Sequence, residues 1–380
     1  MVKILHCGDM HLDSPFATED AQSAARRRNE LSLAFVNMMM YAKSNDISLI
    51  ILPGDLFDSD EPSPDTVEMV RREFENAHNI KIVIAPGNHD PYLKGGVWDT
   101  ADFSDNVFIF KDNSLSRFDF DEFNLSVYGY AFVSSRMTSL PFSPTSVEGV
   151  DRSRINILCA HADLTRGSSD YCPISPADIA NSPFDYIALA HIHERTEPAR
   201  EGSTYYSYCG CLEGRDFGEC GCKGATVAIL DKDSDDATFS IKSAFVRFSR
   251  HRYIIENLDV TGMKTNSEME TAFAGIVKNG AYGEDTLLRL VVTGQAAAAL
   301  HISHGVFEPK AKGICYLEVR DESIPALDYE ALEDDRTVRG AFFESLRTDL
   351  FGEDENKKAI AERALRIGLA ALADGDLSAL

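Results

Sequence analysis

The stretch IKIVIAPGNHDPYLKGG, residues 80–96, decides the fold class of this chain. Its apolar first part, IKIVIA, predicts a buried strand that ends at Pro86-Gly87. An amide, an imidazole and a carboxylate follow at once in Asn88, His89 and Asp90. Because Gly and Asn favour turns, a turn accounts for part of this pattern. A turn does not explain why similar clusters recur after other apolar runs.

Five apolar runs are followed closely by Asp, Asn or His. They are VKILHC before Asp9 and His11, ISLIIL before Asp55, IKIVIA before Asn88, INILCA before His161, and YIALA before His191 and His193. Runs that are apolar throughout are typical of strands buried on both faces. Helical patterns lie between them, one from Thr18 to Ser44 and one that begins at Ser63-Pro64. This alternation predicts an α/β fold, in which side chains beyond the strand ends gather in one crevice.

The clustered side chains are oxygen and imidazole donors, a set that suits Mn, Fe or Zn better than Ca or Mg. Asp9 and His11 are two residues apart, so an extended backbone points both to one side. The donors outnumber the needs of one ion, and Asp55 can bridge two. We predict a site for two divalent metal ions, with Mn expected and Fe or Zn as alternatives. Its ligands would be Asp9, His11, Asp55, Asn88, His161, His191 and His193.

The order DxH…GD…GNHD…H…HxH resembles the calcineurin-like metallophosphoesterase superfamily over about residues 1–225. The resemblance implies a sandwich of two mixed sheets flanked by helices. Ala190 stands where the family often has Gly before the last pair. The resemblance also implies two ligand sets that share Asp55: Asp9, His11, Asp55 and His193 for one metal, and Asp55, Asn88, His161 and His191 for the other.

The resemblance also implies catalytic roles. Metals in such a site lower the pKa of a water toward neutrality, and the hydroxide attacks phosphorus. His89 would donate a proton or stabilise the transition state, and Asp90 would orient its ring. Asp58 stands where some relatives have a His that assists protonation of the leaving group, so its role is left open.

Three segments resemble SbcD-like DNA repair exonucleases and, among them, the YhaO-type branch. They are ILHCGDMHLDSPF (4–16), GDLFDSDEPSPDT (54–66) and YCGCLEGRDFGECGCKG (208–224). The strand LLRLVVTG (287–294) and the helical tail resemble a capping domain and a region that docks an SbcC-like coiled-coil ATPase. The resemblance therefore implies a DNA exonuclease of a repair complex, with DNA and this ATPase as partners. Candidate DNA contacts are Lys94, Tyr92, Arg215 and Lys223.

Three domains are expected: a nuclease domain over residues 1–250, a capping or DNA-binding domain over 251–325, and a helical tail over 326–380. From about residue 204, TYYSYC, GATVAIL and ATFSIKSAFVRF predict antiparallel strands. The acidic segment 321–336 is expected to be a connector. In the tail, Ile360, Ala364, Ile367 and Ala371 form a one-sided stripe, which would either pack on the capping domain or bind a partner.

Composition limits the alternatives. The 380 residues are 44% hydrophobic and carry a net charge of −24, which is not the basic footprint of a nucleic-acid coat protein. No apolar run approaches the roughly 20 residues of a membrane span. The start MVKILHCGD shows no signal peptide, so a cytoplasmic location and reduced cysteines are expected. A small-molecule phosphodiesterase such as a cyclic-nucleotide enzyme, a non-catalytic scaffold subunit and a homodimer remain open.

Two further clusters each have a structural and a functional interpretation. Cys209, Cys211, Cys220 and Cys222 could bind structural zinc or remain free thiols, although Cys-x-Cys is tighter than the usual ligand spacing. Arg26-Arg27-Arg28 lies on a predicted helix, where a solvated face is expected.

Overall fold

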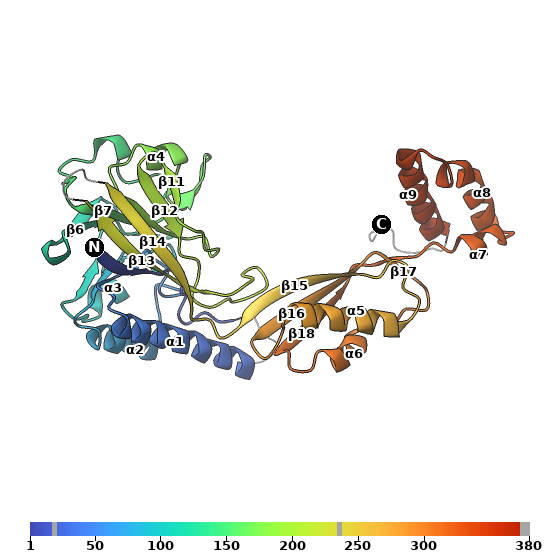
Figure 1. Ribbon diagram of the computed structural model, residues 1–380, viewed down its shortest axis with the longest axis horizontal. Helices are drawn as coiled ribbons and strands as arrows, with labels where there is room; N and C mark the ends of the chain where they lie inside the picture. Colours follow the sequence, from blue (N-terminus) through green and yellow to red (C-terminus); the bar gives the residue numbers. More distant parts are fainter. Residues whose placement is uncertain (17–20, 234–237, 373–380) are drawn as a thin grey trace. The chain divides into compact units, whose positions relative to one another are not determined.

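The computed structural model describes residues 1–16, 21–233 and 238–372, and the chain divides into two compact units, Met1–Tyr253 and Ile254–Leu380. The first unit contains two six-stranded sheets, and the second contains a three-stranded sheet and most of the C-terminal helices (Figure 1). Among the described residues, no helix combines the length and the apolar character needed to cross a membrane.

The first sheet has the order β14-β13-β1-β2-β3-β4. Strands β1 to β4 run parallel, while β13 pairs with β1 and β14 in antiparallel fashion. The parallel core places the carboxyl ends of β1, β2 and β3 at the same edge. The strand bounds are β1 Val2–His6, β2 Leu49–Leu52, β3 Lys81–Ile84, β4 Val107–Ile109, β13 Gly224–Lys232 and β14 Phe239–Arg247.

The second sheet has the order β11-β12-β10-β7-β6-β5. Its four central strands are parallel, and β5 and β11 are antiparallel edge strands. The strand bounds are β5 Ser116–Phe120, β6 Leu125–Gly129, β7 Ile155–His161, β10 Tyr186–Ala190, β11 Ala199–Glu201 and β12 Thr204–Tyr208.

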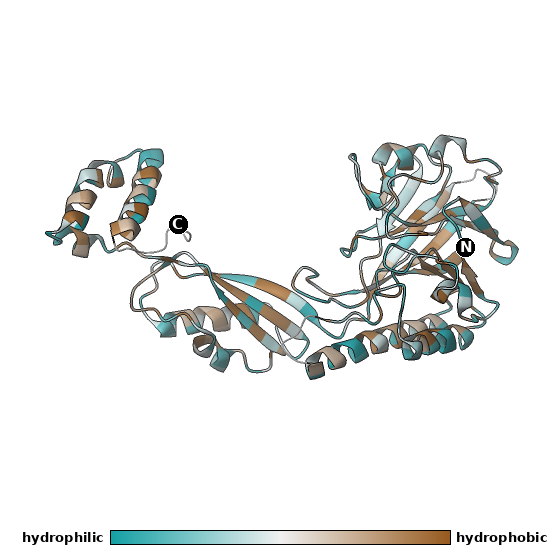
Figure 2. Cartoon of the chain, turned by 180° about the vertical axis from the view of Figure 1, so that it is seen from behind, coloured by the Kyte–Doolittle hydropathy of each residue, from teal (hydrophilic) through white to brown (hydrophobic). Residues whose placement is uncertain are grey.

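The two sheets pack face to face because alternate strand residues point to opposite sides. Ile4, Ile51 and Val83 of the first sheet meet Val127 and Ile157 of the second in one buried cluster. Figure 2 shows hydrophobic residues along these strands, as a core between sheets requires. The first unit is therefore a β-sandwich with parallel centres in both sheets.

Helices cover the outer faces of the sandwich. Helices α1 (Ala21–Ser44) and α2 (Pro64–Glu75) lie along the first sheet (Figure 1), with Phe35 and Phe74 packed in one cluster with Ile50. Helix α4 (Pro176–Ala180) buries Ile179 against the second sheet. The short helix α3 (Val97–Thr100) and the small pair β8 (Asp163–Leu164) and β9 (Pro173–Ile174) complete this unit.

The second unit has a sheet of order β15-β16-β18. Helix α5 packs Met269 and Phe273 against Leu288 and Leu290 of this sheet, and a separate cluster around Phe343 and Leu365 holds the C-terminal helices together. The elements are β15 Arg252–Asp259, α5 Asn266–Asn279, β16 Thr286–Thr293, β17 Gln295–Ala296, α6 His304–Phe307, β18 Tyr316–Asp321, β19 Ile324–Pro325, α7 Tyr329–Glu333, α8 Val338–Leu350 and α9 Glu355–Leu372.

The predicted fold class is confirmed, with two local corrections. Strand β12 pairs antiparallel with β11, as expected, but it also pairs in parallel with β10 in the second sheet, while β13 and β14 join the first. The predicted connector 321–336 contains β19 and α7. Residues 18–20 of the first predicted helix and Ala237 of a predicted strand lie outside the described residues.

The stripe on α9 points away from the packed face of that helix. The side chains of Ile360 and Ile367 are 70% and 41% exposed, whereas Ala361 and Leu365 are buried. The alternative in which the stripe packs on the capping domain is therefore wrong for the part of the chain that the structure describes.

Candidate metal centre

The predicted ligands lie at the carboxyl ends of β1, β2, β3, β7 and β10: His161 is the last residue of β7, and the others lie in the loops that follow these strands. These strands are neighbours within their sheets, and the sheets face each other across the core. Asp9, Asp55 and His161 bring one potential ligand atom each within 4.8 Å of one another, and Asp9, His11 and His193 do the same. Residues from distant parts of the sequence thus form two overlapping donor groups.

Asp55 lies between the two groups. Its Oδ2 is 3.7 Å from His11 Nε2 and 3.5 Å from His161 Nε2. His161 Nε2 is also 2.8 Å from Asn88 Oδ1. One carboxylate therefore faces a donor of each predicted ligand set, as a bridging ligand must.

His191 is placed by its main chain as well as by its ring. Its N–H donates to both carboxylate oxygens of Asp9 at 3.0 Å. Its ring lies 5.1 Å from the ring of His161 and 4.6 Å from that of Tyr171, measured between centroids. Burial lowers the pKa of His191 to about 4, which favours the neutral imidazole that binds metals.

His11 and His193 each direct one ring nitrogen toward the other at this site. His11 Nδ1 is 3.1 Å from Asp58 Oδ1, and His193 Nδ1 is 2.6 Å from Glu219 Oε1. The Glu219 carboxylate only accepts, so His193 Nδ1 donates to it, and Arg215 Nη2 lies 3.0 Å from the same nitrogen. These two Nε2 atoms lie 3.2 Å apart. Two ring nitrogens from distant parts of the chain thus face the same point, as a shared metal ion requires.

The second ligand set shows the same arrangement. His161 Nδ1 donates to the carbonyl oxygen of Pro53 at 3.0 Å, so the neutral form of this ring has no hydrogen on Nε2. That Nε2 faces the oxygens of Asn88 and Asp55, which are acceptors too. The side chains present therefore fit two divalent cations.

The backbone at the site is strained in a consistent way. Asp9, His11, Asp55 and His191 have φ values of 46°, 50°, 51° and 100°, in the left-handed region that non-glycine residues seldom adopt. Such conformations cost roughly 1–3 kcal/mol each and concentrate at functional sites. Four of the seven predicted ligands share this feature, so the fold holds these residues in backbone conformations that they seldom adopt by themselves.

Two glycines let the loops approach each other. A Cβ on Gly87 would lie 2.2 Å from Asp55 Oδ1, and one on Gly54 would lie 2.6 Å from His161 Nδ1. Gly54 also has a φ of 108°. The Pro-Gly pairs that end β2 and β3 are thus required by close packing of ligands as well as by turn geometry.

His89 lies at the exposed edge of the donor groups. Its ring meets the ring of His11 edge to face at 4.6 Å, and its Nδ1 donates to the main-chain oxygen of Asp58 at 3.0 Å. Its Nε2 is therefore free to exchange a proton with a bound molecule.

The expected role of Asp90 is corrected. Asp90 is fully buried, and its oxygens accept from the main-chain N–H groups of Asp55, Leu56, Phe57 and Gly87 at 2.8–3.2 Å. It therefore holds the Asp55 loop and does not orient His89. Asp58, whose role was open, places its carboxylate beside His11 and its carbonyl beside His89.

The structure separates the four candidate DNA contacts. Lys223 is buried and its Nζ donates to His193 O at 3.0 Å, so the expectation that it binds DNA is wrong. The side chain of Arg215 donates a hydrogen bond to Glu219, which lies beside the predicted ligand His193. The Tyr92 hydroxyl donates to Asp99 and its half-buried ring packs against the core, so its role in stacking stays a prediction. Lys94 is exposed and stays a prediction.

Two residues at the site were missed by the sequence analysis. Glu219 accepts a hydrogen bond from His193. The sequence signal for it is an acidic residue within the segment 208–224, which resembles a loop of SbcD-like nucleases. Tyr171 stacks on His191, and no motif marks it. Burial alone would favour the acid form of Glu219, but hydrogen bonds from His193 and Arg215 lower the pKa of its carboxyl well below its usual range.

The four loop cysteines line one pocket of about 240 Å³. Cys209 and Cys211 are buried, Cys220 and Cys222 are exposed, and none of these four described residues is in a disulfide. Their sulfurs do not form a group with the mutual spacing of metal ligands within the described chain, which favours free thiols over zinc. Cys211 instead lies 3.7 Å from Glu219 Oε2.

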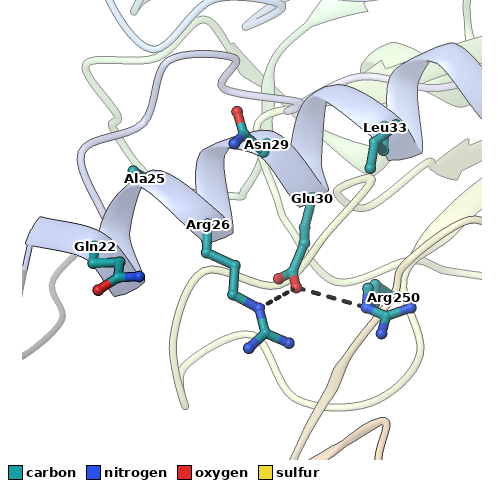
Figure 3. Close-up of a pocket in the computed structure, with 7 residues that line it drawn as sticks. All are labelled: Gln22, Ala25, Arg26, Asn29, Glu30, Leu33 and Arg250. Atoms are coloured by element: carbon teal, nitrogen blue, oxygen red, sulfur yellow. Dashed lines mark hydrogen bonds and ion pairs between the residues drawn. The ribbon is translucent and has the colours of Figure 1, made fainter.

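The arginine triplet on α1 is not a uniform solvated face. Arg27 is buried and bonds Glu30, Glu213 and the carbonyl of Gly214. Arg26 is exposed and pairs with Glu30 at the rim of a pocket of about 510 Å³, where Arg250 reaches the same carboxylate (Figure 3). The expectation is therefore wrong for Arg27, because the loop after β12 covers it.

Comparisons with known proteins agree with this geometry. The chain is 27% identical over 359 residues to the uncharacterized metallophosphoesterase YhaO of Bacillus subtilis, which covers 88% of this chain and 79% of that protein. It is 25% identical over 223 residues to the DNA double-strand break repair protein Mre11 of Saccharolobus solfataricus, which covers 55% of this chain and 54% of that protein. Residues 2–195, which include every predicted metal ligand, match the calcineurin-like phosphoesterase family, and this chain belongs to that family.

Proposed function

We propose that this protein is a metal-dependent phosphodiesterase that cleaves DNA as the nuclease subunit of a repair complex. The observation that carries the proposal is Asp55, whose Oδ2 lies between His11 and His161. This geometry supports two cations sharing one carboxylate. When bound, the two cations would neutralise the phosphate and lower the pKa of a water toward neutrality. Mn is the proposed metal, with Fe or Zn as alternatives.

The residues of the chain have separate parts in this reaction. Asn88 contributes a neutral oxygen, so the site keeps positive charge for an anionic ester. The P–O bond to the leaving oxygen breaks as the new P–O bond forms, and the leaving oxygen needs a proton. The protonated His89 ring is placed to supply it from Nε2, because its Nδ1–H is fixed by the carbonyl of Asp58.

DNA as substrate is supported by the similarity to a protein named for double-strand break repair. The coiled-coil ATPase remains a proposed partner, for which the exposed stripe on α9 offers an apolar surface. A small-molecule phosphodiesterase is the alternative, since it shares the same metal chemistry.

The test compares two substrates with Mn²⁺ present. We expect degradation of duplex DNA with defined ends and little turnover of a cyclic nucleotide. His89→Gln should lower DNA cleavage about 100-fold or more, because general acids contribute roughly 10²–10⁴ in rate. Mn²⁺ binding by calorimetry should be retained, since no predicted ligand is changed.

Three outcomes would contradict the proposal in different ways. Preferred turnover of the cyclic nucleotide would favour the small-molecule enzyme. Full DNA cleavage by His89→Gln would remove the assigned role of His89. A wild-type protein that binds no Mn²⁺, Fe²⁺ or Zn²⁺ would favour a non-catalytic scaffold.

A further inference from the structure

Glu219 forms a short hydrogen bond with the ring of a predicted metal ligand, His193. Its Oε1 accepts from His193 Nδ1 at 2.6 Å, on the far side of the ring from the Nε2 that faces His11. Glu219 is 9% exposed, so water competes little for this bond. A histidine held in this way has a fixed tautomer and a fixed ring direction.

Arg215 holds Glu219 in this position. Its Nε and Nη2 donate to Glu219 Oε1 at 3.1 and 2.8 Å, and its main-chain N–H donates to Oε2 at 2.8 Å. Both carboxylate oxygens are therefore occupied, and the side chain is held from two directions. Charged pairs with several bonds of this kind have well-defined geometry.

Arg215 also reaches the other histidine of the same ligand set. Its Nη1 lies 3.3 Å from Asp58 Oδ1, and that oxygen is 3.1 Å from His11 Nδ1. A continuous chain of contacts therefore runs from His193 through Glu219, Arg215 and Asp58 to His11. It connects loops after β1, β2, β10 and β12.

The second ligand set has no such support. His161 Nδ1 bonds the neutral carbonyl of Pro53, and His191 contacts the Tyr171 ring. Carboxylate partners make a ligand imidazole more basic than carbonyl partners do. Among the described residues, the close carboxylate partners of ligand Nδ1 atoms are thus those of His11 and His193, whereas Asp9 Oδ1 lies farther from His161 Nδ1, at 3.9 Å.

We propose that Glu219, held by Arg215, is a positioning residue that fixes His193 and thereby strengthens the binding of one of the two metal ions. The inference rests on the proposed dinuclear hydrolase but is tested without any substrate. Glu219 does not touch the reacting atoms, and its effect is transmitted through His193.

The experiment titrates Mn²⁺ alone into full-length protein stripped of metal, with calorimetry and electron paramagnetic resonance of free Mn²⁺ as readouts. Wild type should bind two equivalents. Glu219→Gln should weaken one equivalent by about 10–100-fold and leave the other near its wild-type affinity, as for other partners of metal-bound histidines. Circular dichroism and the fluorescence of Trp98 verify that the variant is folded.

A matched control is available in the same loop. Asp216 is exposed, and Asp216→Asn removes the same charge three residues away from Glu219. It should leave both Mn²⁺ affinities unchanged. Equal losses in the two variants would mean that only the net charge of the loop matters, and the proposal would then be overturned.

A double-mutant cycle tests whether Glu219 acts through His193. In a His193→Ala background, Glu219→Gln should cause little further loss of Mn²⁺ affinity. Additive losses, or wild-type affinity in Glu219→Gln alone, would overturn the proposal. If Glu219→Gln fails to fold, Arg215→Gln should weaken the same single equivalent, and unchanged binding there would count against it. Because no assay uses DNA, failure of the nuclease proposal would be seen separately.

Discussion

Individual residues show where chemical type is informative and where it is not. The ligand types were readable because Asp, Asn and His follow apolar runs, and such residues have few structural reasons to recur there. His6 shows the opposite case. It is a titratable group two to three residues from the first ligand block, but it is fully buried between the sheets, where Nδ1 lies 2.8 Å from Tyr186 Oη and Nε2 lies 3.1 Å from Leu189 O.

The buried His6 predicts a dependence of stability on pH. Burial lowers its pKa from 6.5 to about 3 in the folded protein, so the unfolded chain binds the proton first. Its contribution is complete above about pH 6.5 and is lost as the pH falls toward 3. The free energy of unfolding should therefore fall by about 1.4 kcal/mol per pH unit between pH 6 and 4 from this group alone.

Denaturant unfolding followed by fluorescence of Trp98, the one tryptophan of the chain, measures this slope in the first unit. In His6→Gln the slope should decrease by that amount. The exposed His78 provides the control, and His78→Gln should keep the wild-type slope. An unchanged slope in His6→Gln would show that His6 is not the group responsible.

At the scale of elements, strands and helix starts followed local signals. Helix α2 begins with Ser63 as N-cap and Pro64 at the first turn, as the sequence predicts. Strand pairing was less predictable. Turn residues flank β12 and favour antiparallel pairing, but β12 also pairs in parallel with β10. Which sheet a strand enters depends on packing with residues that lie far away in the chain.

Helix α2 is also tied to the loop that follows His11. Asp13 accepts from Ser63 N at 2.7 Å and from Thr66 Oγ1 at 2.6 Å. Asp13→Asn introduces a residue that, like Asp, tolerates the φ of 72° at this position. Its side-chain NH₂ group, however, would face Ser63 N or Thr66 Oγ1, which are themselves hydrogen-bond donors. The free energy of unfolding should fall by about 1 kcal/mol, whereas exposed Asp60→Asn should change it by less than about 0.5 kcal/mol.

At the scale of the whole molecule, the family match over residues 2–195 lies within the first unit, ends before β11 and does not reach the second unit. What the second unit does is therefore a proposal. The clearest feature in it is the exposed stripe of α9, which contains Ile360 and Ile367. Exposed apolar residues on one helix face are typical of a surface that another helix covers.

This stripe predicts a selective loss of partner binding. Changing Ile360 and Ile367 together to Glu should leave unfolding and Mn²⁺ binding unchanged, because both side chains are exposed. Binding to a purified SbcC-like ATPase, measured by calorimetry, should weaken at least about 10-fold, since burial of each such side chain contributes roughly 1.5–3 kcal/mol. Ala359→Glu, at an exposed position on another face of α9, should bind normally. Equal binding by all forms would remove α9 as the docking surface.

The sequence by itself determined the α/β class and the set of metal donors. Continuous apolar runs and the polar residues beyond their ends are local patterns, and parallel strands bring such ends together in any sheet of this kind. The tertiary structure alone decided which partner each donor has. Asp90 bonds main-chain amides, Lys223 is buried against His193, Arg27 is covered by the 213–214 loop, and Glu219 fixes His193. Most of these contacts join residues that are far apart in the chain, and burial in the fold selects them.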